Sequence, residues 1–280
     1  MKPLPSQPFH EKDSWLATLL LLGVAGLFLY PFLWMFLSGF KTNLEIFNPR
    51  RFWPQHFDPR YYAQLFRGDY IPFARVFANS LAVALGQAVG TVMLTSLAGY
   101  VFARHQLRFQ KVLFLLAVVV IVVPRQALAV PLFVWLHQLG LLDHLWGVIL
   151  PGMVSGLGIL FFTQIFRQLP QDLISVARLE GASEFRVYWT LLPLIRSALL
   201  SFGLIQFVLS WHEHLIPLLV LQSPGQQTLP LALASLTGSS LRYDQAVLMA
   251  ASSLMILPTA VLFALMYRRF QNSLSELLVH

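Results

Sequence analysis

The chain has 280 residues, of which 57% are hydrophobic and only 11% are charged, and its formal net charge is +7. A soluble globular domain carries about 25% charged residues, so the composition excludes an ordinary soluble enzyme, a disordered tail and a fibrous protein. The sequence contains no cysteine, which excludes disulfides, iron–sulfur clusters and zinc held by cysteine. No basic cluster lies on a soluble segment, so the positive charge indicates membrane flanks and not nucleic-acid binding.

Six apolar segments are long enough to cross a bilayer, which needs about 20 apolar residues in a helix. We therefore expect an all-α integral membrane protein with six transmembrane helices. They are predicted at residues 15–40, 77–103, 112–136, 145–166, 197–221 and 246–267. The first segment is too long for the core of a signal peptide, and no small-residue cleavage pattern follows it, so we expect it to be retained.

The basic residues of the short loops predict which side of the membrane the two termini face. Three of them lie between the second and third segments, four between the fourth and fifth, and two beside each terminus. The other short loops carry only Arg242. Cytoplasmic loops are enriched in Lys and Arg, so we expect both termini in the cytoplasm. The first loop is also basic, but it is long, and long loops are translocated across the membrane largely regardless of their charge.

Residues 167–196, between the fourth and fifth segments, predict two short helices joined at a glycine. Pro170 can begin the first helix, because a proline in the first turn loses no donor that the helix needs. Gly181 permits a helix end or a sharp turn. A second helix is expected to begin near Ser183, and Pro193 precedes the fifth span. This helix–glycine–helix elbow is predicted to lie at the cytoplasmic membrane surface.

The elbow has an apolar face with basic residues at its edges. Leu173, Val176 and Ala177 recur at helical spacing. Such a face can lie on anionic lipid or can dock a cytoplasmic partner. The residues by themselves leave both interpretations open.

The spacing within the elbow resembles the coupling loop of binding-protein-dependent ABC importer permeases. That pattern is Glu-Ala-Ala, three residues, Gly, nine residues, Ile, one residue and Leu-Pro. The corresponding residues here are Ser175-Val176-Ala177, then Gly181, and after nine residues Leu191-Leu192-Pro193, in which the proline comes one position earlier than in the pattern. Ser175 replaces the glutamate that contacts the ATPase in the family. The resemblance implies an ATPase-coupling set of Leu173, Ser175, Val176, Ala177, Glu180, Gly181, Ala182 and Pro193.

Four further stretches resemble the same family in order and spacing. They are residues 40–47, 78–81, 129–142 and 206–218. The chain is most similar to the sugar-type permeases related to the smaller permease subunit of the maltose transporter. The resemblance covers roughly residues 14 to 270. It implies a cytoplasmic segment at 1–14, a transmembrane permease domain at 15–270 and a cytoplasmic tail at 271–280.

The resemblance implies a permease subunit that forms half of the pathway of an ATP-driven importer for a sugar or a related small polar solute. The implied partners are a second permease subunit, two ATPase subunits, an extracytoplasmic solute-binding protein and membrane lipid of the bacterial plasma (inner) membrane. The chain has no Gly-x-x-x-x-Gly-Lys-Ser/Thr phosphate loop. We therefore expect no catalytic residue, no metal and no cofactor here, with ATP and magnesium bound by the partner ATPases.

Five residues within the predicted spans are candidates for lining the pathway: Arg125, Gln126, Gln206, Ser210 and Trp211. The ring of Trp211 could stack on a sugar or anchor the helix at the membrane interface. Arg125 could contact solute, or could pair or reach the membrane surface, because an arginine within a membrane needs a partner.

Two other functional classes are weighed against the importer. A self-contained secondary transporter or channel would need ionisable relays within the bilayer, and such groups are scarce here. An intramembrane zinc protease is suggested by His212-Glu213-His214. The zinc motif places its histidines at i and i+4, whereas residues at i and i+2 of a helix point about 200° apart.

Overall fold

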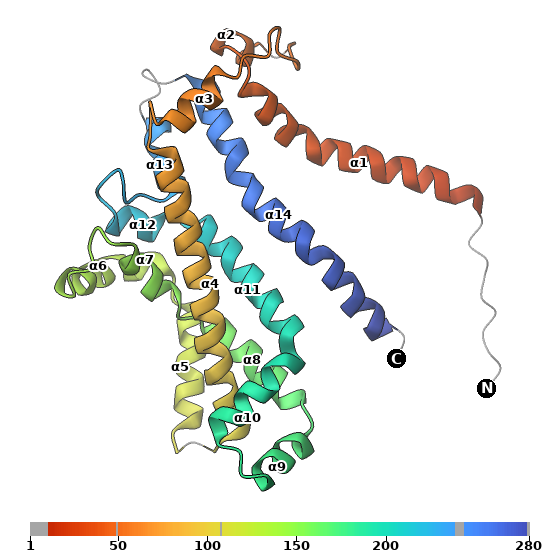
Figure 1. Ribbon diagram of the computed structural model, residues 1–280, viewed down its shortest axis with the longest axis vertical. Coiled ribbons are helices and arrows are strands. Elements are labelled where there is room, and N and C mark those ends of the chain that lie inside the picture. The colour runs from red at the N-terminus through yellow and green to blue at the C-terminus, as the bar shows by residue number, and fades with distance from the viewer. Residues whose placement is uncertain (1–10, 49, 107, 239–243, 279–280) are drawn as a thin grey trace. The chain divides into compact units, whose positions relative to one another are not determined.

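The computed structural model describes residues 11–48, 50–106, 108–238 and 244–278 (Figure 1). Within these ranges the chain forms helices and no strand. The helices divide into two compact units, which are described separately. The first contains α1, α2, most of α3 and the beginning of α14, and the second contains the remaining elements.

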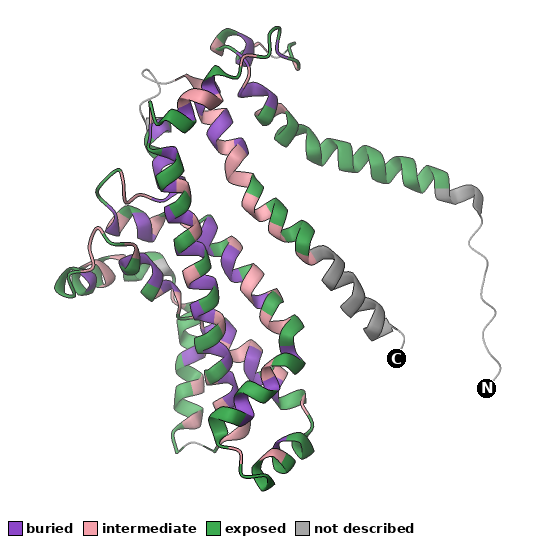
Figure 2. Ribbon diagram, viewed as in Figure 1, coloured by how far each residue is buried: buried purple, intermediate pink, exposed green. Residues whose placement is uncertain are grey.

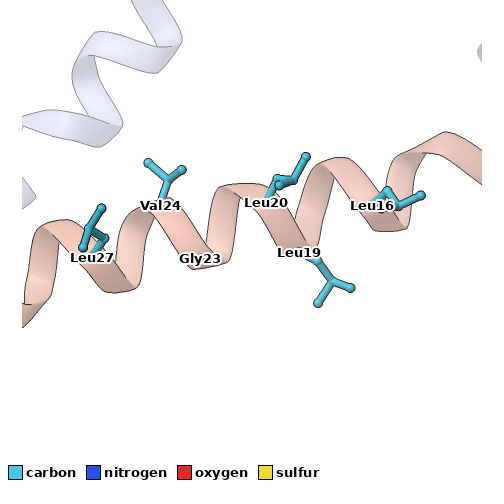
Figure 3. A pocket seen from close by; sticks show the side chains of 6 residues that line it. All are labelled: Leu16, Leu19, Leu20, Gly23, Val24 and Leu27. Carbon is cyan, nitrogen blue, oxygen red and sulfur yellow. The ribbon is translucent and has the colours of Figure 1, made fainter.

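The first unit begins with α1 (Glu11–Ser38) and continues with α2 (Asn43–Ile46), α3 (Arg60–Arg67) and the first turns of α14 (Gln245–Leu278). The surface of α1 is exposed over most of its length (Figure 2). Six residues of this one helix surround a shallow notch at Gly23: Leu16, Leu19, Leu20, Gly23, Val24 and Leu27 (Figure 3). Because a single exposed apolar helix forms the notch, it is a lipid-type surface and not an enclosed site.

The turn after α1 is built around a buried lysine. Lys41 is fully buried, and its Nζ donates a hydrogen bond to the carbonyl oxygen of Arg51 at 3.0 Å. Burial lowers the pKa of Lys41. Thr42 and Glu45 form a capping box at the start of α2, and the backbone N–H of Thr42 lowers the pKa of Glu45. This network explains the resemblance at residues 40–47.

The second unit is organised around the long helix α4 (Phe73–Arg104). Helices α8 (Gly156–Gln168) and α11 (Arg196–Trp211) make its most extensive contacts. The other elements are α5 (Gln110–Val122), η1 (Arg125–Leu128), α6 (Ala129–Gln138), α7 (Leu145–Gly152), α9 (Gln171–Leu179), α10 (Glu184–Leu191), η2 (Leu192–Ile195), α12 (Leu215–Val220) and α13 (Leu229–Gly238).

Four helical stretches of the described chain are long and apolar enough to cross a membrane: Trp15–Ser38, Phe73–Arg104, Glu184–Trp211 and Gln245–Met266. Two further segments are helix pairs bent at a break. The number of candidate spans therefore rises to six if each bent pair counts as one. These stretches overlap the six predicted segments, but three of the segments differ from the prediction in their bounds or continuity.

The helix expected at 112–136 is not continuous. It ends at Val122, and a new helical segment begins at Arg125 after Pro124, with a bend of 100°. Proline disfavours helical geometry at the residue before it and lacks an N–H, so Pro124 explains the break. The helix expected at 145–166 is bent by 46° between Gly152 and Gly156.

The helix expected at 197–221 is shifted along the chain. The candidate span runs from Glu184 through Pro193 to Trp211 and is followed by the separate short helix α12. Pro193 therefore lies within this stretch, in the 3-10 turn between α10 and α11. Its ring is tolerated because a proline in the first turn of a helical segment loses no needed donor.

Small residues bring α4 close to its neighbours, as the glycine pattern of this helix suggests. A Cβ added at Gly90 would lie 1.9 Å from the Met153 side chain. A Cβ at Gly99 would lie 2.6 Å from Phe162 Cβ and 2.8 Å from the backbone N of Thr163. The contact at Gly99 includes backbone of α8, so it cannot be relieved by a side-chain rotation.

We expect Gly99→Ala to destabilise the protein by about 1–3 kcal/mol, because it forces α4 and α8 apart. Gly203→Ala is the matched control, since its Cβ would make ordinary contact with Val92 at 3.5 Å. Thermal unfolding of the purified, solubilised protein measures both effects. Equal melting temperatures for the two variants would contradict the close approach of these helices.

Two polar residues at the start of α4 hold the loop that precedes α13. Asn79 Nδ2 donates to the carbonyl oxygens of Gly225 and Gln227, both at 3.0 Å. Ser80 Oγ accepts from the backbone N–H of Leu229 at 2.7 Å. Asn79 and Ser80 lie in the stretch 78–81 that resembles the family, and these bonds give the pair a structural role.

Asp143 joins two loops at the same end of the second unit. Its backbone has a positive φ of 59°. Its Oδ1 accepts the backbone N–H groups of Gln222 and Ser223 at 2.9 Å, and its Oδ2 accepts the Ser223 hydroxyl. These bonds, first those from Ser223, lower the pKa of Asp143.

The carboxylate of Asp143 should make the stability of these loops depend on pH. Its folded pKa lies below the usual value of about 3.9. The ionised Asp143 therefore contributes its full stabilisation when the pH is above the pKa of the unfolded chain. This stabilisation is lost as the pH falls through the lower pKa of the folded protein. We expect Asp143→Asn to flatten the dependence of melting temperature on pH between about pH 5 and pH 3. Ser223→Ala should flatten it less, because the backbone donors remain.

Candidate coupling elbow and solute cavity

The elbow consists of α9 and α10 joined at Gly181, as predicted. The φ angle of Gly181 is +79°. Its N–H donates to the carbonyl oxygen of Arg178, and the N–H of Ala182 donates to that of Ala177, both at 3.0 Å. This pair of bonds is a Schellman motif, which ends a helix with glycine in the left-handed conformation. The backbone thus explains why glycine stands at this position.

The two sides of α9 face different surroundings. Ile174 is buried at 4% exposure, and the half-buried Ala177 packs against the same apolar cluster. Leu173, Val176 and Leu179 are exposed, Leu179 at 88% (Figure 2). The sequence analysis placed Ala177 on the docking face and did not use Leu179. Ile174 and Ala177 are three positions apart and therefore lie on the same, inner side of the helix. The exposed apolar face consists instead of Leu173, Val176 and Leu179.

Four other members of the predicted coupling set lie around this face. Ser175 is exposed, and its Oγ donates to the carbonyl oxygen of Gln171 at 3.1 Å. Glu180 and Pro193 are exposed, and Ala182 is half-buried beside the core cluster. At the position of the family's glutamate the exposed surface of α9 therefore presents the hydroxyl of Ser175, next to the exposed Leu173, Val176 and Leu179.

A polar cluster centred on the exposed side chain of Glu184 connects the elbow to the end of α4. Glu184 Oε1 accepts from Arg178 Nε at 2.8 Å, and its Oε2 accepts from the Tyr100 hydroxyl at 2.7 Å. His105 Nε2 lies 3.2 Å from the same Oε2. The hydrogen bond to Glu184 raises the pKa of Arg178. The cluster joins α9, α10 and the end of α4, which are far apart in sequence.

The pairing of Arg178 with Glu184 is not apparent from the sequence. Side chains on one helix face each other when they are three or four residues apart. Arg178 and Glu184 are six residues apart and lie on different helices, so their spacing does not predict a contact. Their pairing depends on the turn at Gly181, which reverses the chain between α9 and α10.

Arg104 fixes the other connection to the elbow. Its Nη2 donates to the carbonyl oxygens of Phe166 and Leu169. These carbonyls belong to the end of α8, where helix carbonyls lack partners within the helix and carry partial negative charge. The arginine thus holds the segment leading into α9 against the end of α4.

A cavity of about 370 Å³ lies between the helices of the second unit. Gln206 lines it, together with Gln87 and Glu213. Glu213 Oε1 accepts the backbone N–H of Leu215 at 2.9 Å. The cavity is therefore the place where the structure brings the predicted pathway residue Gln206 together with two further polar residues.

The other predicted pathway residues lie elsewhere. Trp211 is buried, stacked on Phe207 and edge-on to Phe77 with ring centroids 5.8 and 5.6 Å away. Ser210 is also buried and does not line the cavity. Gln126 is exposed in η1, and the side chain of Arg125 lies outside the described residues.

The segment His212-Glu213-His214 is not helical, contrary to the geometry assumed for it. His212 ends α11 and His214 precedes α12. Among the side chains that the structure describes, no three His, Asp or Glu residues gather in a group that could hold a metal ion.

The arrangement of helices matches a solved membrane transporter. The structure superposes with a TM-score of 0.79 on a chain from the crystal structure of a bacterial ABC transporter involved in the import of the acidic polysaccharide alginate. The match covers 95% of this chain and all of that chain at 19% sequence identity. This likeness defines the fold as that of an ABC permease.

Sequence relatives extend the assignment from fold to family. The family model for the binding-protein-dependent transport system inner membrane component matches residues 93–276. The arabinooligosaccharides transport system permease protein AraQ of Bacillus subtilis (strain 168) is 32% identical over 265 residues, covering 92% of both chains. The lactose transport system permease protein LacG of Rhizobium radiobacter is 31% identical, covering 88% of this chain and 89% of its own. The chain therefore belongs to the binding-protein-dependent ABC transporter permeases, which confirms the resemblance seen in its sequence.

Proposed function

We propose that this permease subunit forms half of the pathway of an ATP-driven importer for a sugar or a related small polar solute. The observation that carries the proposal is the braced elbow, whose exposed Leu173, Val176 and Leu179 form an apolar surface at the coupling-loop position of the family. The relatives that transport arabinooligosaccharides and lactose support a sugar as solute.

In this proposal the elbow transmits the movement of the ATPase subunits to the helices. ATP closes the ATPase dimer, α9 and α10 follow it, and the pathway changes from inward-facing to outward-facing. Such a change is a rigid-body switch between two packed arrangements. ATP and magnesium are bound by the two ATPase partners, a second permease subunit completes the pathway, and an external binding protein delivers the solute.

We further propose six spans, with each bent pair counted as one, and both termini in the cytoplasm of a bacterial cell. The charge of the short loops supports this orientation. Reporter fusions at Gln138 and Gln226 should then report the outside, and fusions at Gln106 and Glu184 the inside. The reverse pattern would overturn the orientation and would remove the elbow from the ATPase side.

The function is tested by co-expressing the permease with its neighbouring genes and purifying the complex. We expect a second permease and an ATPase to co-purify. Reconstituted with its binding protein, the complex should hydrolyse ATP faster when arabinotriose, lactose or trehalose is present. Uptake by this chain alone, driven by an ion gradient and independent of ATP, would instead favour a secondary transporter.

A further inference from the structure

The cavity of the second unit lies at two helix breaks. Val123 and Leu128 line it on either side of the break after α5, while Gly152 and Ser155 line it at the break between α7 and α8. Helix breaks within a membrane expose backbone carbonyl and N–H groups that need polar partners, and are tolerated where they line a cavity. In transporters, interrupted helices often surround the solute.

Two buried glutamines reach the second break from different helices. Gln87 of α4 and Gln206 of α11 are each only 3% exposed. Gln87 Nε2 donates to the carbonyl oxygen of Val148 at 2.8 Å, and Gln206 Nε2 donates to that of Gly152 at 3.4 Å. These bonds fix the orientation of both amides. An amide group has a second N–H and a carbonyl oxygen, so each can also bond to a ligand in the cavity.

The remaining lining is chemically suited to a neutral solute. The described side chains around the cavity include one carboxylate, Glu213, and no lysine or arginine. Most of the others are apolar, among them the ring of Phe202. Ligand sites typically combine such apolar walls with a few oriented polar groups, at volumes of about 300–1,000 Å³.

From this geometry we propose that the cavity is a solute-binding site belonging to this subunit itself, and that it takes a neutral, hydroxyl-rich molecule such as a mono- or disaccharide. The amides of Gln87 and Gln206 bond to hydroxyl groups of the solute, and Phe202 and its apolar neighbours cover its C–H surface. The inference rests on the proposed transport function and adds to it a site, two specificity residues and a preference against anionic solutes.

The first test fills the cavity. Leu209 lines it from α11 and is 58% exposed, so a larger side chain can be accommodated without disrupting the core. We expect Leu209→Trp to lower import of the transported probe sugar at least tenfold, because the indole ring occupies the volume that the solute would fill. Leu200→Trp, on the same helix and 40% exposed but outside the cavity, is the control and should retain import within about twofold.

The second test separates ligand bonding from helix bracing. Import of lactose or trehalose is compared with import of monodeoxy analogues of the same sugar, using one binding protein throughout. A site built to bond a hydroxyl discriminates against a ligand that lacks it. The measured quantity is the import rate of the sugar divided by the import rate of its analogue. We expect Gln206→Leu and Gln87→Leu each to lower this ratio roughly tenfold for at least one analogue. A purely bracing role would lower both rates and leave the ratio unchanged.

Gln206→Asn keeps the amide group on a shorter side chain, so it replaces the leucine variants if those fail to assemble. It too should lower the ratio of the import rates of sugar and analogue. Unchanged ratios in all variants, or full import by Leu209→Trp, would overturn the site while leaving the transport function intact. A wild-type complex that imports none of arabinotriose, lactose and trehalose would overturn the proposed function itself, and the site with it.

Discussion

Gly181→Val should uncouple the transporter. The added side chain would meet no atom within 4 Å, so its effect comes from the backbone alone, at φ +79°. A residue with a Cβ costs about 1–2 kcal/mol in this conformation. If the helix end shifts to relieve that strain, the apolar face of α9 is misplaced. We expect roughly a tenfold loss of ATPase affinity, since about 1.4 kcal/mol corresponds to one decade.

A matched variant distinguishes coupling from general stability. Gly140 follows α6, has φ +66° and would also gain a side chain without any contact within 4 Å. Gly140→Val should therefore cost similar stability but leave ATPase binding intact. Gly181→Asn should largely preserve coupling, because asparagine tolerates this conformation at helix ends. Normal solute-stimulated ATP hydrolysis by Gly181→Val would show that the elbow only lies on the membrane surface.

Glu184→Ala should loosen the elbow from the end of α4. The substitution removes the partner of Arg178 and leaves the hydroxyl of Tyr100, a residue only 2% exposed, without its acceptor. An unsatisfied buried polar group costs about 1–3 kcal/mol. We expect lower thermal stability and less solute transported per ATP hydrolysed in proteoliposomes.

A double-mutant cycle checks the cause of that loss. Tyr100→Phe removes the orphaned hydroxyl, so adding it to Glu184→Ala should cost less than the sum of the two single effects. Glu180→Ala is the control for thermal stability alone, because its carboxylate is exposed on the same elbow. Strict additivity of the two substitutions would mean that the Tyr100–Glu184 bond does not brace the elbow.

The local patterns of the elbow and of the apolar segments were enough to predict much of the fold. Proline before α9, glycine after it and an apolar repeat between them depend only on near neighbours in sequence. The helix breaks were harder to predict because hydropathy averages over them. Pro124 sits inside a segment whose apolar character continues on both sides, so hydropathy predicts a single span there and gives no angle for the bend.

The contents of the candidate sites were predicted less well, since they depend on contacts across helices. Gln87 and Glu213 line the cavity with Gln206 only after α4, α11 and the loop after α11 are packed. Gln87 stands in a stretch of small residues that indicates helix packing equally well. Likewise, Glu184 meets Tyr100 across 84 positions of sequence, a pairing that no short-range pattern contains.

The broken helices also bear on how the chain enters the bilayer during synthesis. Helices α5 and α8 have 13 residues each, or about 20 Å, less than the hydrocarbon thickness of about 30 Å. Neither can span alone, whereas the apolar stretches of α1 and α4, with 24 and 32 residues, can. Because α5 packs against α8, we expect residues 110–168 to enter the bilayer together and not one helix at a time. A nascent chain that ends before α8 should then hold α5 in the membrane less well than the full chain does.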